Sequence, residues 1–175
     1  MKAILTFLGL CLFNICYSQP PLAGEHLYNS DIDKFEGTWK WTSGNSELII
    51  QLKKVHYLLK AGYYEDIIMG VHRFTDGAVI IEDKLAEFPM LGQNHKGSIF
   101  LWSEGVSSNP NKISGGLKDP IKNKEDNLVL LYIASTPATL TWNLFNFDGP
   151  KVQKNREPPI DNSFTLPQNI TLIKQ

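Results

Sequence analysis

Short stretches in which apolar and polar residues alternate, each bounded by turn-forming residues, are the feature that most constrains the fold of this chain. Leu48, Ile50 and Leu52 alternate with polar side chains, as they would in a strand with one buried face. Residues 37–41 show the same alternation, and the intervening residues 42–45 have the composition of a tight turn. Together these segments predict a β-hairpin.

A second hairpin is predicted by an Asp-Gly pair between two apolar stretches. Residues 67–74 and 78–82 flank residues 75–77, Thr-Asp-Gly, and Asp-Gly in this position is the strongest short-range hairpin signal. Residues 55–64 are compatible with another strand, interrupted at Ala61-Gly62. Further strands are predicted at residues 98–102, 112–117, 128–134, 139–145 and 170–173.

These strands indicate the fold class. No segment has a helical period of useful length, and the sequence contains no internal repeat. About eight to ten short strands separated by turns predict an all-β fold, a single antiparallel β-barrel or sandwich whose strands are mostly connected by hairpins. Because strands that are neighbours in sequence usually pair, an up-and-down meander is favoured. The pattern leaves barrel and sandwich open.

The N-terminus has the features of a signal peptide. A positive charge at Lys2 precedes an apolar stretch at residues 3–13, and small residues stand before the Ser18-Gln19 bond. The apolar stretch is shorter than the roughly 20 residues of a membrane span, and no later segment approaches that length. We therefore predict cleavage after Ser18 and an extracytoplasmic location, in the periplasm or secreted.

Cys16 offers a less favoured alternative, in which a lipid on this cysteine would anchor the protein to a membrane. Lipoprotein signals carry small residues before the modified cysteine, whereas Asn14 and Ile15 precede it here. Cleavage after Ser18 would remove Cys16 together with Cys11, the only other cysteine. The exported chain would then have no disulfide, no thiolate nucleophile and no cysteine-ligated metal.

The charge of the chain argues against nucleic acids as partners. The formal net charge is −1, and Arg73 and Arg156 are the only arginines, whereas nucleic-acid binding requires a basic surface rich in arginine. The chain is expected to comprise a signal peptide at residues 1–18, a polar, irregular lead-in at residues 19–34 and a single β-rich domain at residues 35–175.

The segment Gly37-Thr38-Trp39 resembles the signature that opens lipocalins and related ligand-binding barrels. In those proteins the tryptophan closes the base of the barrel, and an arginine from near the end of the chain usually stacks on it. The only late arginine here, Arg156, falls in a loop segment. On this resemblance, Gly37, Trp39 and Trp41 are predicted to be structural signature residues. The likeness implies a ligand-binding barrel. The alternative is a tryptophan that only fills the core.

No catalytic, metal-binding or cofactor-binding constellation is predicted, so an enzyme is not expected. Adjacent acids such as Glu65 and Asp66 point to opposite faces of a strand, although Asp66 and Asp83 could meet at the open end of the second hairpin. Neither a nucleophile elbow nor a phosphate loop is present. Four histidines show no ligand-like spacing and are expected on the surface or hydrogen-bonded in the core: His26, His56, His72 and His95.

Several segments match a known family. They are residues 35–42 (Phe-Glu-Gly-Thr-Trp-Lys-Trp-Thr), 66–70 (Asp-Ile-Ile-Met-Gly), 115–116, 128–133, 140–142 and the ending 166–175. On these segments the chain resembles an uncharacterised family of small secreted Bacteroidota proteins. The resemblance covers residues 35–175 and implies an exported single-domain protein, with no known activity and no functional residues.

Two functions are compatible with these observations. The first is a non-enzymatic binding module for a small apolar or amphipathic ligand. The second is a cell-envelope or surface domain with a solid core that binds another protein through a face or through loops such as residues 103–111 and 148–159. A cavity lined by aromatic residues inside the fold would favour the first function, and a filled core would exclude a ligand held inside the fold.

Overall fold

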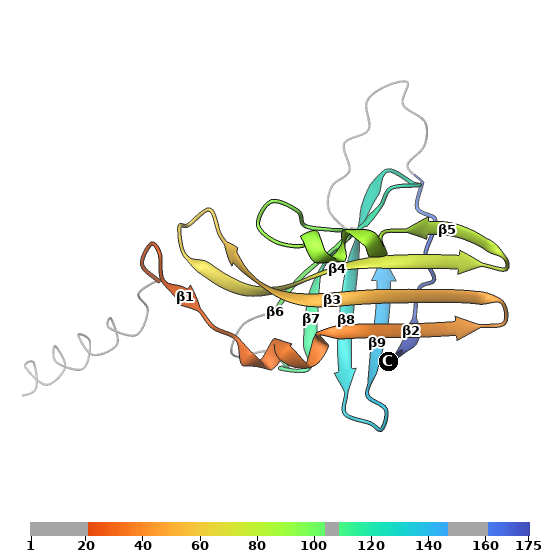
Figure 1. Ribbon diagram of the computed structural model, residues 1–175, viewed down its shortest axis with the longest axis horizontal. Coiled ribbons are helices and arrows are strands. Elements are labelled where there is room, and N and C mark those ends of the chain that lie inside the picture. The colour runs from red at the N-terminus through yellow and green to blue at the C-terminus, as the bar shows by residue number, and fades with distance from the viewer. Residues whose placement is uncertain (1–20, 104–108, 147–160) are drawn as a thin grey trace, which may run out of the picture.

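The computed structural model describes residues 21–103, 109–146 and 161–175, and these residues form an antiparallel β-barrel (Figure 1). Its elements are β1 (His26–Leu27), the 3-10 helix η1 (Ser30–Phe35), β2 (Gly37–Ser43), β3 (Ser46–Leu58), β4 (Tyr64–Asp76), β5 (Val79–Asp83), the 3-10 helix η2 (Leu85–Met90), β6 (Ile99–Ser103), β7 (Lys112–Asp119), β8 (Lys124–Ile133), β9 (Thr139–Phe145) and β10 (Ile170–Lys174).

Eight of the strands close on themselves. The pairing runs from β4 through β3, β2, β10, β9, β8 and β7 to β6, and β6 pairs with β4 to complete the ring. The short strands β1 and β5 lie outside the ring and pair with β4. The prediction of an all-β fold with a meander order is confirmed, and the pairing of β4 with β6 makes it a barrel.

The strands of the barrel fall into two groups that cross in the view of Figure 1. In Figure 1, β2, β3, β4 and β5 run across the view, whereas β8 and β9 run nearly at right angles to them. The β3–β4 hairpin pairs from Glu47 with Thr75 to Leu58 with Tyr64, but β6 pairs only with residues 68–70 of β4. One end of this long hairpin therefore extends beyond the ring, toward β1.

The turns of the predicted hairpins are as short as the sequence indicates. Ser43 pairs with Ser46, and Asp76 pairs with Val79, so two residues form each turn. Gly77 has a φ angle of +63°, which glycine adopts without strain. The expectation of a separate strand at residues 55–64 is wrong. Its first residues end β3, and residues 59–63 form the turn into β4.

Residues 19–34 were expected to be an irregular lead-in, and for residues 21–34 this is wrong. His26 and Leu27 pair in parallel with Tyr64 and Glu65 of β4. The following helix η1 buries Ile32, which is 1% exposed, among the core residues of the barrel. An apolar side chain at one position of a polar segment gives no periodic signal, so the sequence pattern does not reveal it.

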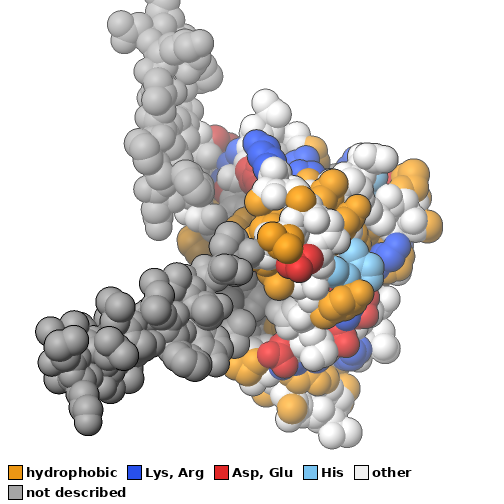
Figure 2. All heavy atoms as spheres, turned by 90° about the vertical axis from the view of Figure 1, so that its left-hand side faces the viewer, with side chains coloured by type: hydrophobic (Ala, Val, Ile, Leu, Met, Phe, Trp, Pro, Cys, Tyr) orange, Lys and Arg blue, Asp and Glu red, His pale blue; other side chains and the backbone are white. Residues whose placement is uncertain are grey.

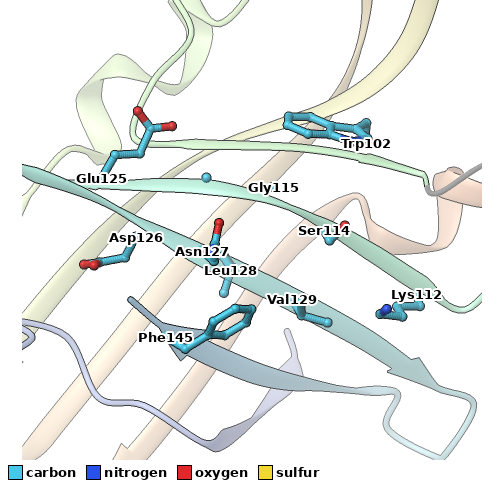
Figure 3. Close-up of a pocket in the computed structure, with 11 residues that line it drawn as sticks. Trp102, Lys112, Ser114, Gly115, Glu125, Asp126, Asn127, Leu128, Val129 and Phe145 are labelled. Carbon is cyan, nitrogen blue, oxygen red and sulfur yellow. The ribbon is translucent and has the colours of Figure 1, made fainter. Parts of the chain in front are cut away.

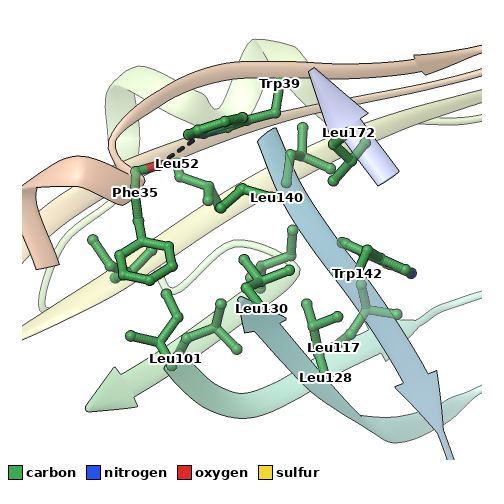
Figure 4. Close-up of a cluster of buried hydrophobic side chains, with 14 of the residues drawn as sticks. Phe35, Trp39, Leu52, Leu101, Leu117, Leu128, Leu130, Leu140, Trp142 and Leu172 are labelled. Atoms are coloured by element: carbon green, nitrogen blue, oxygen red, sulfur yellow. Dashed lines mark hydrogen bonds between the residues drawn. The ribbon is translucent and has the colours of Figure 1, made fainter. Parts of the chain in front are cut away.

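The interior of the barrel is a packed core (Figure 4). Side chains from every strand of the ring contribute to it, because alternate residues of each strand point inward. The predicted inward face of β3 is confirmed, since Leu48, Ile50 and Leu52 are buried. Figure 4 shows Leu101, Leu130 and Trp142 converging on the centre from different strands. The space that a lipocalin uses for its ligand is occupied here by these side chains.

Trp39 lies in this core. It is fully buried, and its Nε1 donates a hydrogen bond to the carbonyl oxygen of Phe35 at 2.8 Å (Figure 4). Lys174 Nζ, from the last strand, lies 5.0 Å from the centre of the Trp39 ring. Gly37 has a φ of +120°, and Trp41 is half-buried against the core.

Some expectations fall on residues that the structure does not describe. The signal peptide, the Ser18–Gln19 bond, Cys16, Arg156 and the loop at residues 148–159 all lie outside the described residues. Among the described residues, no helix is long and apolar enough to span a membrane.

Candidate functional site

An open groove of about 830 Å³ lies on the outer face of the barrel, across β6, β7, β8 and β9 (Figure 3). The register of these strands arranges its residues in rows. Phe100 of β6 is opposite Gly116 of β7, Gly116 is opposite Asn127 of β8, and Asn127 is opposite Phe145 of β9. This row crosses four strands with a glycine inside it, so the sheet surface is hollowed at that point.

The two neighbouring glycines of β7 have different surroundings. A Cβ on Gly115 would lie 2.1 Å from the carbonyl oxygen of Phe100, so β6 and β7 approach each other too closely there for any side chain. A Cβ on Gly116 would instead meet Glu125 Oε1 at 2.3 Å, the end of a flexible side chain. Gly115 is thus required by backbone packing, whereas the missing side chain of Gly116 leaves room for the Glu125 carboxylate.

Aromatic rings stand at both sides of this floor. Trp102 is 43% exposed and Phe145 is 40% exposed, and Figure 3 shows them on opposite sides of β7 and β8. The aromatic surface continues from Trp102 to Phe100, with ring centres 5.7 Å apart, and on to Tyr57 at 5.3 Å. Phe100 and Tyr57 are half-buried against a second apolar cluster, so Trp102 and Phe145 provide the exposed apolar ring surface of the groove.

Polar side chains are interspersed with these rings. Glu125 and Asn127 line the groove, and among the described residues neither side chain has a hydrogen-bond partner. Lys96 lies 5.1 Å from the ring centres of both Tyr57 and Phe100. The groove therefore combines apolar faces with unused hydrogen-bonding groups, as sites for amphipathic ligands do.

A second cluster lies on the extension of the β3–β4 hairpin, where β1 joins it. His56 of β3 is directly opposite Asp66 of β4, and β1 brings His26 to the same carboxylate. His26 Nε2 and His56 Nδ1 lie 2.7 and 2.5 Å from Asp66 Oδ1. The backbone N–H of Asn29 donates to Asp66 Oδ2 at 2.9 Å.

These contacts control the charge of Asp66. The side chain is 1% exposed, and burial alone would raise the pKa of its carboxyl group. The Asn29 N–H and the two histidines outweigh burial and hold the pKa of Asp66 below its usual range. Asp66 is therefore ionised at neutral pH, with two imidazole nitrogens directed at one of its oxygens.

A third polar cluster is buried where β4, β5 and β6 meet. His72 Nδ1 lies 2.8 Å from Ser98 Oγ, and His72 Nε2 lies 3.0 Å from Glu82 Oε2. The second contact is close but not aligned as a hydrogen bond. The order serine, histidine, carboxylate is that of a hydrolase triad, but Ser98 is only 7% exposed and its N–H is bonded to Gly70. We interpret it as a structural network.

The structure differs from the sequence-based expectations for the acidic residues and for two of the histidines. Asp83 pairs in register with Arg73, so the suggested meeting of Asp66 with Asp83 is wrong. His72 is a core histidine with a hydrogen bond, and His95 is a half-exposed histidine 2.9 Å from Glu87, both as expected. The convergence of His26 and His56 on one carboxylate was missed.

Comparison with known proteins gives a family and no function. The whole chain, residues 1–175, matches the model of a family of unknown function, DUF6705. No curated protein and no solved structure matches the chain. The predicted resemblance to a family of unknown function is confirmed, and the likeness to lipocalins is consistent with the eight-stranded barrel.

Proposed function

We propose, for a chain that belongs to the DUF6705 family of unknown function, that the protein is a binding module that holds a small amphipathic ligand in its outer groove. The observation that carries the proposal is the open groove on the outer face of the barrel, which the exposed rings of Trp102 and Phe145 line. Following the signal pattern of residues 1–18, we also propose that the protein acts outside the cytoplasm.

The interior of the barrel is filled by side chains, which argues against a ligand held inside it. We therefore place the proposed binding site on the outer face. An internal ligand would need a chamber, but the inward-facing residues form a core with Trp142 and Trp39 fully buried. The groove offers what the interior does not: open volume, exposed aromatic rings and hydrogen-bonding groups. This replaces the expected chamber of a lipocalin with a surface site.

The lining indicates the chemistry of the ligand. A flat apolar ring face fits the Trp102 indole and the Phe145 ring, while hydroxyl groups at the ring edge fit Asn127 and Glu125. A sugar ring has both properties, because its C–H groups form an apolar face and its hydroxyls lie around the edge. We therefore propose an oligosaccharide as the ligand class.

Binding of soluble oligosaccharides, measured on a glycan array and then by calorimetry, tests the proposal. Trp102→Ala removes an exposed ring, and Gly116→Leu displaces the Glu125 side chain and places a larger apolar group in the groove. Each is therefore expected to weaken binding about tenfold or more. Gly92→Leu is the matched control, because a Cβ at Gly92 has no atom within 4 Å. Absence of any glycan ligand, or equal affinity in all three variants, would overturn the proposal.

An interaction with another protein is the second candidate, and the edge strand β5 favours it. Among the described residues β5 pairs with β4 alone, and its Val79 and Ile80 are 60% and 59% exposed. An open edge with exposed apolar side chains can accept a strand from a partner. Val79→Lys combined with Ile80→Lys would abolish such a complex in a pull-down from the host envelope while leaving glycan binding unchanged.

A further inference from the structure

We propose that His26, His56 and Asp66 form a binding site for a divalent transition-metal ion such as Zn²⁺. Their three candidate ligand atoms lie within 4.8 Å of one another. The residues come from β1, β3 and β4, so that a bound ion would join the N-terminal strand to the central hairpin. This inference is independent of the proposed sugar site.

The donor set suits such an ion. Imidazole nitrogen and carboxylate oxygen bind Zn²⁺ at about 2.0–2.2 Å, and two histidines with one carboxylate leave coordination positions open for water. Asp66 supplies the negative charge, and its two oxygens face the Asn29 N–H and the two imidazole nitrogens. The two ring nitrogens that would bind the ion, His26 Nε2 and His56 Nδ1, already point at the same carboxylate oxygen.

The surroundings fix the orientation of the ligands. The Asn29 N–H binds Asp66 Oδ2 and leaves Oδ1 facing the histidines. The Tyr28 ring lies 3.7 Å from the His26 ring, which restricts rotation of that imidazole. Supporting contacts of this kind orient metal ligands in known sites. Among the described residues, Lys54 is the one cation paired with Asp66 that would repel a bound metal ion. Its Nζ lies 3.9 Å from Asp66 Oδ2 and is also paired with Asp33.

The site opens to solvent on one side. Asp66 is buried, His26 is 16% exposed and His56 is 59% exposed, so an ion can enter over the histidines. Figure 2, which views the molecule from the β1 side, shows histidine side chains at the surface beside hydrophobic and basic ones. Because His56 is 59% exposed, we expect an outward rotation of its ring to separate Nδ1 from Asp66 and admit the ion.

The direct test is metal binding by the full chain without a polyhistidine tag. After treatment with a chelator, the protein is titrated with ZnCl₂ by calorimetry and with CoCl₂ by visible absorption. We expect one ion per chain, and Co²⁺ absorption bands typical of a site with nitrogen ligands. Zn²⁺ should also raise the melting temperature, because an ion that binds only the folded chain stabilises it.

Variants separate a metal site from a purely structural cluster. His56→Ala removes an exposed ligand and is expected to fold normally, and it should weaken Zn²⁺ binding at least tenfold, as should His26→Ala. His95→Ala removes a histidine that faces Glu87 outside the cluster and should bind Zn²⁺ like the unmodified chain. Failure to bind Zn²⁺ and Co²⁺, or equal loss in His95→Ala and His56→Ala, would overturn the proposal.

Discussion

Gly115 and Gly116 are adjacent on β7 but face opposite sides of the barrel wall. A Cβ on Gly115 would lie 2.1 Å from the Phe100 carbonyl oxygen, whereas a Cβ on Gly116 would contact the end of the Glu125 side chain. The pair therefore has two functions that one residue could not serve. Gly115 permits β6 and β7 to approach each other, and Gly116 leaves room for the Glu125 side chain on the outer face.

This difference predicts that the same substitution costs much more stability at Gly115 than at Gly116. Gly115→Ala forces the backbones of β6 and β7 apart and is expected to lower the free energy of unfolding by about 2 kcal/mol or more. Gly116→Ala displaces only a flexible side chain and should change it by less than about 0.5 kcal/mol. Urea denaturation of the two variants measures both values. Equal costs would show that the close approach at Gly115 is not required.

The lysine above Trp39 gives a second prediction. Lys174 Nζ lies 5.0 Å from the centre of the buried Trp39 ring, and a cation over a tryptophan contributes about 0.5–1 kcal/mol. Lys174→Met keeps the apolar stem but removes the charge, and should lower the free energy of unfolding by about that amount. Lys174→Arg keeps a cation and should retain stability. A similar loss in both variants would exclude the ring contact as the cause.

The strand pattern was predictable because it is a local property. Leu48, Ile50 and Leu52 face inward as their alternation indicates, and the Asp-Gly signal at residues 76–77 identified a hairpin turn. Closure was not predictable, because it depends on the pairing of residues 68–70 with residues 99–101. Alternation shows that a strand has a buried face, but not which distant strand completes the sheet.

The histidine cluster was missed for a similar reason, although part of its signal is present. His56 and Asp66 are equally distant from Ala61, so a turn centred there pairs them, as β3 and β4 do. The prediction of a separate strand at residues 55–64 placed His56 and Asp66 in strands that were not expected to pair in this register. His26 lies near Asp66 because the two residues of β1 pair in parallel with β4. A two-residue strand in a polar segment has no periodic pattern that would predict this pairing.

The buried network around His72 gives a prediction about stability. Ser98→Ala would leave His72 Nδ1 without its partner at 2.8 Å, and an unsatisfied buried polar group costs about 1–3 kcal/mol. Ser46→Ala is the matched control, since it removes an exposed bond from Ser46 Oγ to Asp76 and should cost about 0.5 kcal/mol or less. Thermal and urea unfolding of both variants make the comparison. A cost in Ser98→Ala no larger than in Ser46→Ala would contradict the structural role of the network.

Glu47 gives a prediction about pH. The hydrogen bond from Lys40, whose Nζ lies 2.5 Å from Glu47 Oε2, lowers the pKa of the Glu47 carboxyl, and Arg73 adds to the effect. A carboxyl with a lowered pKa in the folded state stabilises the protein at pH values above its ordinary pKa of 4.5. That stabilisation is lost as the pH falls through the lowered pKa of the folded state.

Glu47→Gln should therefore lower the free energy of unfolding at pH 7 by about 0.5 kcal/mol, the size expected for a partly exposed pair. The difference from the unmodified chain should shrink below about pH 4 as Glu47 takes up a proton. It should also fall at high salt, which screens surface charges. Urea denaturation over this pH range provides the measurement, with Glu125→Gln as a control carboxylate that has no described hydrogen-bond partner. A cost that stays constant from neutral to acidic pH would show that the Lys40 pair is not its source.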